Sequence, residues 1–211
     1  MSKTICLALT GASGMPYGLR LLECLLEAGC KVQLLYSQAS QVVAKQEMDI
    51  ELPSRPSEAR AALLARFPTA NEENLSVFGR EEWFAPVASG SNPPDAMVVC
   101  PCSMGTLAAI AQGLASKLIE RAADVVLKEG RQLILVPRET PLSAIHLENM
   151  LRLVRAGAVI LPPNPGFYHH PQRVADLVDF VVARILDQLQ VRHSLMPRWG
   201  EAEGASPVDA R

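Results

Sequence analysis

A short apolar run that ends in a glycine-rich turn constrains this chain more than any other feature of its sequence. Residues 5–9 are apolar, the turn follows at 10–18, and Leu19, Leu22 and Leu26 then recur with the spacing of one helix face. Glycine lets the backbone bend sharply and approach an anion. The first turn of a helix directs unpaired N–H groups and a positive dipole end at such an anion. The pattern predicts a strand, a phosphate-binding turn and a helix.

Apolar runs and helix-like segments alternate along the rest of the chain. We expect strands at 4–9, 31–36, 97–100, 132–136 and 158–161, with a further candidate strand at 75–78. We expect helices at 15–28, 38–46, 60–66, 107–112, 119–129, 143–156 and 171–190. Strands that alternate with helices predict a parallel sheet covered on both faces. The predicted fold class is α/β, a Rossmann-like (flavodoxin-like) three-layer doubly wound sheet.

The chain is long enough for one sizeable domain and does not demand two. Its 211 residues suit a single α/β unit, which we place at 1–200. The tail at 201–211 is small and polar, and we expect it to be disordered. Within the domain, helical spacing predicts that Val42, Val43 and Val174 face the core.

Composition argues against several classes of partner. The chain is 49% hydrophobic and 20% charged with a net charge of −2, so nothing suggests that it binds nucleic acid or an anionic membrane. No apolar stretch reaches the roughly 18–20 residues of a membrane span. The N-terminus enters the first predicted strand without the pattern of a signal peptide. We expect a cytoplasmic protein.

The cysteines and histidines do not form a convincing metal site. The five cysteines are odd in number and lie mostly in apolar runs, so we expect them to be reduced and buried. Cys100 and Cys102 resemble half a metal site, but no second cysteine pair accompanies them. His169 and His170 are adjacent and lack an evident third ligand. We expect no bound metal.

Unusual polar or glycine-rich segments follow the predicted strands at four places. They are 11–14, Ser37, 102–106 and the pair Arg138-Glu139. In a doubly wound sheet, ligands bind outside the carboxyl ends of the strands. We therefore expect these segments to meet at one edge of the sheet and to form the binding site.

The glycine spacing of the first turn disfavours a dinucleotide. Gly11, Gly14 and Gly18 do not follow the G-x-G-x-x-G pattern, and the second strand ends at Ser37 instead of an acidic residue. No lysine follows the glycines as in a P-loop. Ser13 and Ser37 suit a single terminal phosphate. The turn alone is a weak signal, because glycine at this place also serves tight packing.

The charged residues near these segments allow two interpretations. Arg138 at a strand end can hold an anion with its guanidinium fork, or it can form a surface pair with Glu139. Arg121 and Lys128 share one helix face and can bind an anion or simply be solvated. Arg184 is a lone charge on an apolar helix and can extend to solvent instead of binding a ligand.

A set of motifs across the chain resembles the flavin prenyltransferases of the UbiX family. They cover about residues 4–200 and are TGASG at 10–14, YG at 17–18, ASGS at 88–91, PCS at 101–103, RAADV at 121–125, LKE at 127–129, VPRETP at 136–141, PGFY at 165–168 and PRW at 197–199. Met15-Pro16 departs from the family pattern, and the tail after Glu201 matches nothing. In combination these motifs are highly specific.

The resemblance implies an activity, its substrates and its partners. Such an enzyme binds reduced FMN and dimethylallyl phosphate and joins the prenyl group to flavin N5 and C6. The prenylated FMN serves a UbiD-type decarboxylase. The reaction needs no metal, and members assemble as homo-dodecamers. The resemblance favours a monophosphate donor over a diphosphate.

The resemblance also implies roles for residues at matching positions. The residues for FMN are Gly11, Ala12, Ser13, Ser37 (for the phosphate), Ser103, Met104, Gly105, Thr106 and Arg138. The residues for the prenyl phosphate are Tyr168 and Arg184, surrounded by Arg121, Lys128, Glu47, Ser89, Gly90 and Ser91, with Trp199 as an apolar wall. The catalytic residues are Glu139 as acid or base near N5, Ser13 as proton relay, and the cations Lys128 and Arg121. The final base is Glu139 or the retained phosphate.

Other functions remain as alternatives. An FMN-dependent decarboxylase of the cysteine-oxidising type shares the fold, but it carries a histidine after the first strand–helix unit, and the first histidine here is His146. A non-catalytic flavin carrier would need the FMN contacts without Glu139, Lys128 or Arg184. A reductase bound to a dinucleotide ranks last because of the glycine spacing.

Overall fold

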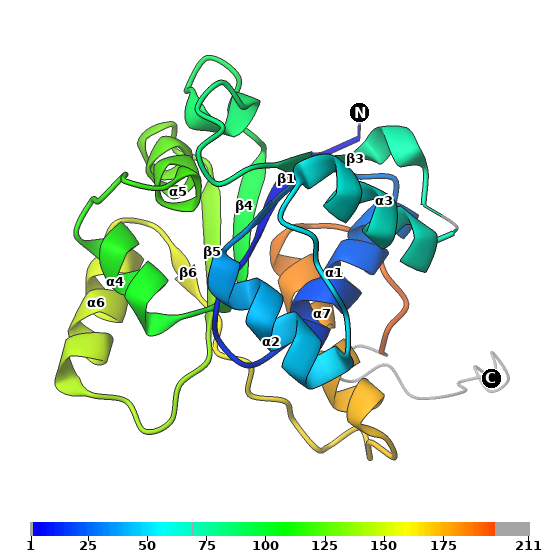
Figure 1. The fold of residues 1–211 in the computed structure, drawn as a ribbon. Helices are drawn as coiled ribbons and strands as arrows, with labels where there is room; N and C mark the ends of the chain where they lie inside the picture. Colours follow the sequence, from blue (N-terminus) through cyan, green and yellow to red (C-terminus); the bar gives the residue numbers. More distant parts are fainter. Residues whose placement is uncertain (1, 69, 197–211) are drawn as a thin grey trace, which may run out of the picture.

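The computed structural model describes residues 2–68 and 70–196, so Trp199 and the tail at 201–211 lie outside the described residues. A parallel six-stranded sheet with the order β3-β2-β1-β4-β5-β6 forms the centre of the molecule (Figure 1). Its strands are β1 (Thr4–Leu9), β2 (Lys31–Tyr36), β3 (Leu75–Phe78), β4 (Ala96–Cys102), β5 (Gln132–Pro137) and β6 (Val159–Ile160). The order reverses between β1 and β4, which makes that boundary the place where a ligand site is expected.

Helices cover both faces of the sheet (Figure 1). They are α1 (Met15–Glu27), α2 (Gln38–Met48), α3 (Pro56–Arg66), α4 (Met104–Ala111), α5 (Leu118–Lys128), α6 (Ala144–Arg155) and α7 (Val174–Gln188), with short 3-10 turns η1 (Glu72–Asn74) and η2 (Pro86–Ala88). One core contains Leu25 of α1 and Val182 of α7, and the other contains Val126 of α5 and Leu153 of α6. The predicted three-layer doubly wound fold is confirmed.

Two helix-face predictions were wrong. Val42 is 57% exposed and Val174 is 77% exposed, whereas both were expected to face the core. Val42 lies on the side of α2 that lines a surface pocket, and Val174 is the first residue of α7, before the helix reaches the sheet. Val43 packs partly buried against the core, as predicted. Helical spacing alone does not say where along its length a helix meets its neighbours.

The cysteine prediction is confirmed. All five cysteines are free and buried. Burial raises the pKa of the Cys102 thiol to about 12 and also raises the pKa of Cys6 and Cys100. Such thiols stay protonated and unreactive at neutral pH, so they act as core residues.

Candidate active site

One buried hydroxyl joins the turn after β1 to the turn after β4. The Thr10 hydroxyl donates to the carbonyl of Pro101 at 2.8 Å and accepts from the N–H of Ser103 at 2.8 Å. Thr10 is only 1% exposed, so this bridge is protected from water. The Ser103 hydroxyl then accepts from the N–H of Thr106 at 3.3 Å and caps α4. Sequence reasoning missed this role of Thr10, although a hydroxyl at the end of an apolar strand was a visible signal.

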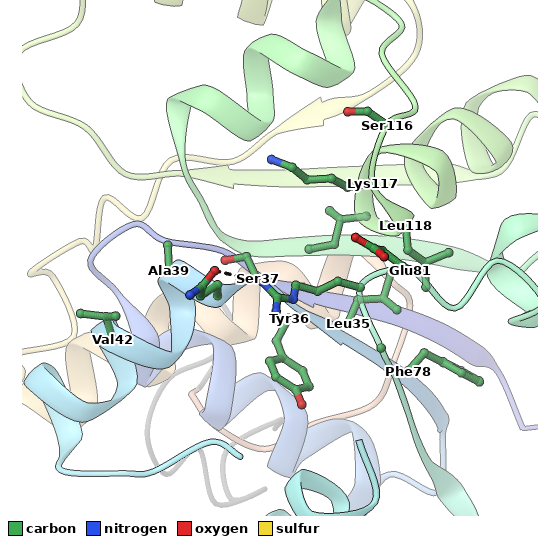
Figure 2. Close-up of a pocket in the computed structure, with 14 residues that line it drawn as sticks. Leu35, Tyr36, Ser37, Ala39, Val42, Phe78, Glu81, Ser116, Lys117 and Leu118 are labelled. Carbon is green, nitrogen blue, oxygen red and sulfur yellow. Dashed lines mark hydrogen bonds between the residues drawn. The ribbon is translucent and has the colours of Figure 1, made fainter. Parts of the chain in front are cut away.

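Ser37 lies beside the same turn. Its N–H donates to the carbonyl of Leu9 at 3.0 Å, and its hydroxyl accepts from the N–H of Ser40 and caps α2. A Cβ atom at Gly11 would collide with the Ala39 side chain, so the first turn packs directly against the start of α2. Gly11 therefore serves close packing of two turns. A pocket opens next to Ser37 (Figure 2).

Arg138, which follows β5, contacts the first turn. Its backbone N–H donates to the carbonyl of Cys102 at 3.3 Å, and its Nε donates to the carbonyl of Ser13 at 3.4 Å. Arg138 and Glu139 also line a hollow of about 370 Å³ outside the ends of β5 and β6. The predicted meeting of the four strand-end segments at one sheet edge is confirmed, and Arg138 contacts the first turn instead of forming a pair with Glu139.

A carboxylate already occupies the anion position at the start of α1. Glu47 accepts hydrogen bonds from the N–H groups of Gly14 at 3.0 Å and Met15 at 2.8 Å. Burial alone would raise the pKa of Glu47, but hydrogen bonds from Ser13, Gly14 and Met15 and the charge of Arg138 together lower it. Two N–H donors at this turn, those of Gly14 and Met15, are therefore used by the chain itself. Sequence reasoning placed Glu47 near the site but gave no signal for this contact.

The predicted residues around α5 form a second group. Arg121 donates from Nε to the carbonyl of Ala88 at 3.0 Å and pairs with Asp124 at 2.7 Å. Lys128 pairs with Glu129, and a Cβ atom at Gly90 would collide with this pair. The loop at 89–91 therefore lies against the end of α5.

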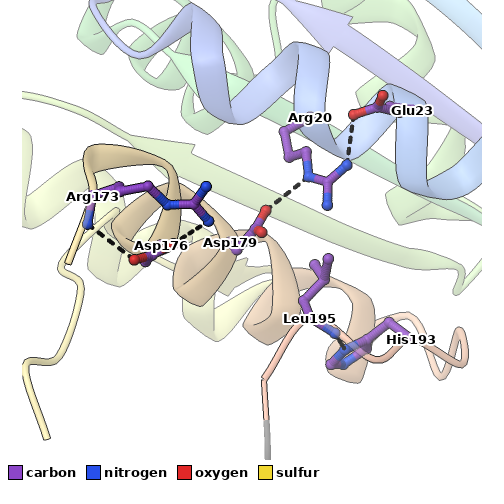
Figure 3. A network of polar contacts seen from close by, with 7 residues as sticks. All are labelled: Arg20, Glu23, Arg173, Asp176, Asp179, His193 and Leu195. Atoms are coloured by element: carbon purple, nitrogen blue, oxygen red, sulfur yellow. Dashed lines mark hydrogen bonds and ion pairs between the residues drawn. The ribbon is translucent and has the colours of Figure 1, made fainter. Parts of the chain in front are cut away.

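Tyr168 and Arg184 lie with α7 and form a third group. The ring of Tyr168 packs edge-on against Phe180 with centroids 5.7 Å apart, and Arg184 follows one turn later on α7 and pairs with Asp187 at 2.7 Å. The helix is held against α1 by Arg20, whose Nε donates to Asp179 at 2.7 Å (Figure 3).

The expected prenyl-phosphate residues do not form one cluster within a single chain. The buried residues of α5 and of α7 belong to the cores on opposite faces of the sheet. Lys128 lies at the end of α5 that leads into the start of β5, whereas Tyr168 follows the carboxyl end of β6. Trp199 lies outside the described residues.

Within residues 2–68 and 70–196, no three His, Cys, Asp or Glu side chains are grouped so that they could hold a metal ion. Across the same part of the chain, none of the helices combines the length and the apolar character needed to cross a membrane.

Comparisons with known proteins identify the family. Residues 1–186 match the family described as Flavoprotein. Flavin prenyltransferase UbiX of Pseudomonas aeruginosa is 58% identical over 197 residues, which cover 93% of this chain and 94% of that protein. The chain belongs to the UbiX family of flavin prenyltransferases. Membership in the UbiX family makes it a transferase, as the resemblance implied.

Solved structures of UbiX-like proteins share its fold. AnUbiX (PadA1), solved in complex with FMN and dimethylallyl pyrophosphate, is 42% identical with a TM-score of 0.84 and covers 96% of this chain and 100% of that one. A dodecameric FMN-dependent UbiX-like decarboxylase from Escherichia coli O157:H7 is 41% identical with a TM-score of 0.81 and covers 93% of this chain and 98% of that one. The rival cysteine-type decarboxylase is not favoured by these relatives.

The contact of Glu47 with the first turn predicts a specific response to acid. Because the pKa of Glu47 is lowered in the folded state, its contribution to stability is present above its ordinary pKa of 4.5 and is lost as the pH falls through the lowered value. Glu47→Gln should therefore be less stable than the wild type at pH 7, and this difference should shrink in acid. Urea midpoints of both proteins between pH 7 and pH 3 measure it.

The matched control for this measurement is Glu51→Gln, since the Glu51 side chain is 83% exposed and forms a surface ion pair with Lys45. Its midpoint should follow that of the wild type at every pH. A gap between wild type and Glu47→Gln that stayed constant down to pH 3 would contradict the assigned role of the carboxylate.

Proposed function

We propose that this chain transfers a dimethylallyl group from dimethylallyl phosphate to N5 and C6 of reduced FMN. The observation that carries the proposal is the meeting of Ser13, Ser37, Ser103 and Arg138-Glu139 at one sheet edge in a chain 58% identical to a flavin prenyltransferase. The complex of AnUbiX with FMN and dimethylallyl pyrophosphate supports the same pair of substrates. FMN is a substrate of this reaction, and its acceptor atoms supply the chemistry.

The residue types match the demands of the reaction. The C–O bond of the prenyl ester breaks, and its electron pair leaves with the phosphate. The allylic carbon that remains is positive, so the site must hold the departing anion with cations and shelter the carbon against aromatic faces. N5 of the reduced flavin bonds to this carbon and loses its proton. Closing the second bond at C6 then requires one proton for the prenyl double bond and the removal of another from C6.

Glu139 is the acid or base that we propose beside the flavin. It lies exposed after the end of β5. In the described part of the chain, its carboxylate accepts one hydrogen bond, from the N–H of Thr140 at 3.2 Å. The hydrogen bond between Ser13 and Glu47 supports the proposal that Ser13 relays a proton. The retained phosphate remains the alternative final base.

The prenyl phosphate site is proposed to form between copies of the chain. Tyr168 and Arg184 lie with α7, whereas Arg121, Lys128 and the loop at 89–91 lie with α5 on the opposite face. A homo-oligomer can place the α5 group of one copy beside the α7 group of another. The dodecameric relative from Escherichia coli supports a homo-dodecamer.

Four further proposals concern Trp199, the recipient of the product, the location of the protein and its domain bounds. We propose that Trp199 adds an apolar wall near the prenyl group, and that the prenylated FMN passes to a UbiD-type decarboxylase. We also propose that the protein works in the cytoplasm as one domain over residues 1–200, with a disordered tail at 201–211.

The activity can be tested directly. Anaerobic incubation with reduced FMN and dimethylallyl phosphate should yield a flavin heavier than FMN by one C5H8 unit, measured by mass spectrometry after the protein is removed. The diphosphate ester serves as the comparison donor. Recovery of unchanged FMN with both donors would exclude prenyl transfer and leave the flavin carrier as the function.

Removing the carboxylate of Glu139 should slow the chemistry without removing the flavin. Glu139→Gln is expected to bind FMN normally and to lower the single-turnover rate by ~10²-fold or more, the usual scale for a general acid–base group. Glu148→Gln, at an exposed position of α6, is the matched control. A wild-type rate in Glu139→Gln would remove Glu139 from the mechanism.

A site formed between copies predicts complementation. Lys128→Gln and Arg184→Gln should each be inactive alone, because in an oligomer of a single variant every shared site lacks one of the two cations. Mixed oligomers obtained by co-expression should regain part of the activity, since some sites then combine an intact Lys128 with an intact Arg184. If the mixed preparation stays as inactive as either variant, both residues act within the same copy or neither acts at the site.

A further inference from the structure

Arg184 on α7 belongs to a short chain of polar groups. Its guanidinium donates to one carboxylate oxygen of Asp187 at 2.7 Å. The other oxygen of Asp187 lies 3.2 Å from Nε2 of His193, in the segment after the helix. Nδ1 of the same ring accepts from the N–H of Leu195 at 3.4 Å (Figure 3). Each oxygen of the Asp187 carboxylate therefore has a partner of its own.

The two contacts of His193 determine where its ring proton lies. A neutral imidazole has one N–H donor and one acceptor nitrogen. Because Nδ1 accepts from a backbone N–H, the proton is assigned to Nε2, which donates to Asp187. The side chain of His193 is only 14% exposed, so water competes little for this hydrogen bond.

The segment that carries His193 is packed against the molecule. The N–H of Val191 donates back to the carbonyl of Leu186 at 3.0 Å, and Val191 is buried. Leu195 packs partly buried against the core that contains residues of α1 and α7. His193 is thus held on both sides, and it offers Asp187 a donor in a fixed place.

The stability of α7 does not account for Asp187. This residue lies in the last turn of the helix, one residue before its end at Gln188. A negative charge there lies beside the negative end of the helix dipole, which is unfavourable. An exposed ion pair with Arg184 compensates little, because two side chains must be ordered and water screens the charges. A role in orienting Arg184 explains a carboxylate at this position.

We propose that Asp187 and His193 are positioning residues that orient the Arg184 guanidinium for binding the phosphate of the prenyl donor. The proposal rests on the proposed prenyl-phosphate site and deepens it. Asp187 uses one N–H of Arg184, and the remaining donors of the planar guanidinium can bind two phosphate oxygens together. A guanidinium that is already held in place loses less conformational freedom when the donor binds.

Orientation and charge predict opposite effects for the loss of Asp187. Asp187 places a negative charge beside the cation, so through charge alone its removal would strengthen the binding of an anion. If Asp187 acts mainly by orienting Arg184, its removal weakens that binding. His193→Leu separates the two effects, because it removes the donor to Asp187 and leaves the charges of Asp187 and Arg184 unchanged.

Binding of the prenyl donor tests this role without turnover. The protein is saturated with oxidised FMN, since the proposed acceptor is reduced FMN, and is titrated calorimetrically with dimethylallyl phosphate. Asp187→Asn and His193→Leu should each weaken binding by about three- to tenfold, the scale of one hydrogen bond. His193→Gln should bind nearly as tightly as the wild type, because its amide can still donate to Asp187. Affinity for FMN should not change in any of these variants.

A double variant shows whether Asp187 acts through Arg184. Arg184→Gln should weaken binding of dimethylallyl phosphate more than Asp187→Asn does, because it removes the cation itself. Adding Asp187→Asn to Arg184→Gln should cause no further loss, since a positioning residue acts only through the residue that it orients.

Glu58→Gln is the matched control. Glu58 forms an i,i+3 pair with Arg55 at the start of α3, at 3.1 Å, with both side chains at least half exposed. This variant should bind FMN and dimethylallyl phosphate like the wild type.

The outcomes separate this inference from the proposed function. Unchanged or tighter binding in Asp187→Asn and His193→Leu would overturn it and leave the pair with Arg184 as a solvated surface contact. An additive loss in the double variant would overturn it as well. In both cases a wild type that forms prenylated FMN keeps the proposed function. A wild type that binds no dimethylallyl phosphate would overturn both.

Discussion

The bridge made by the Thr10 hydroxyl is the interaction on which the candidate site depends. In a parallel sheet whose order reverses between β1 and β4, the turns after these two strands separate toward opposite faces. Thr10 holds them together by binding Pro101 and Ser103 at once. Ser103 then caps α4, and Arg138 reaches back to Ser13 from the next strand. One buried hydroxyl thus sets the relative position of turns that lie far apart in the sequence.

The distribution of charge around this bridge is uneven, and it determines where an anion can bind. Glu47 neutralises the start of α1 from within the chain. Arg80 and Lys117 line the pocket beside Ser37, and Arg138 contacts Ser13 of the first turn. The N–H groups of Gly14 and Met15 at this turn therefore serve the fold.

The separation of α5 from α7 is the observation behind the proposal that the prenyl-phosphate site forms between copies of the chain. Each helix buries an apolar face on its own side of the sheet, so Lys128 and Arg184 are kept apart by the core itself. In a single copy Arg121 pairs with Asp124 and Lys128 pairs with Glu129. Both cations therefore also fit the alternative interpretation, in which they belong to a solvated face of α5.

The sequence by itself determined the strands, the helices and their alternation. The apolar pattern of each segment is a local property, and it reflects which of its faces is buried in the fold. It also indicated the four strand-end segments that meet at one edge, since a parallel sheet places all carboxyl ends together. Only the tertiary structure decided which polar groups satisfy one another there. The hydrogen bonds from Gly14 and Met15 to Glu47, the bridge made by Thr10 and the hydrogen bond from Leu118 to Arg80 depend on distances between segments that no local pattern encodes.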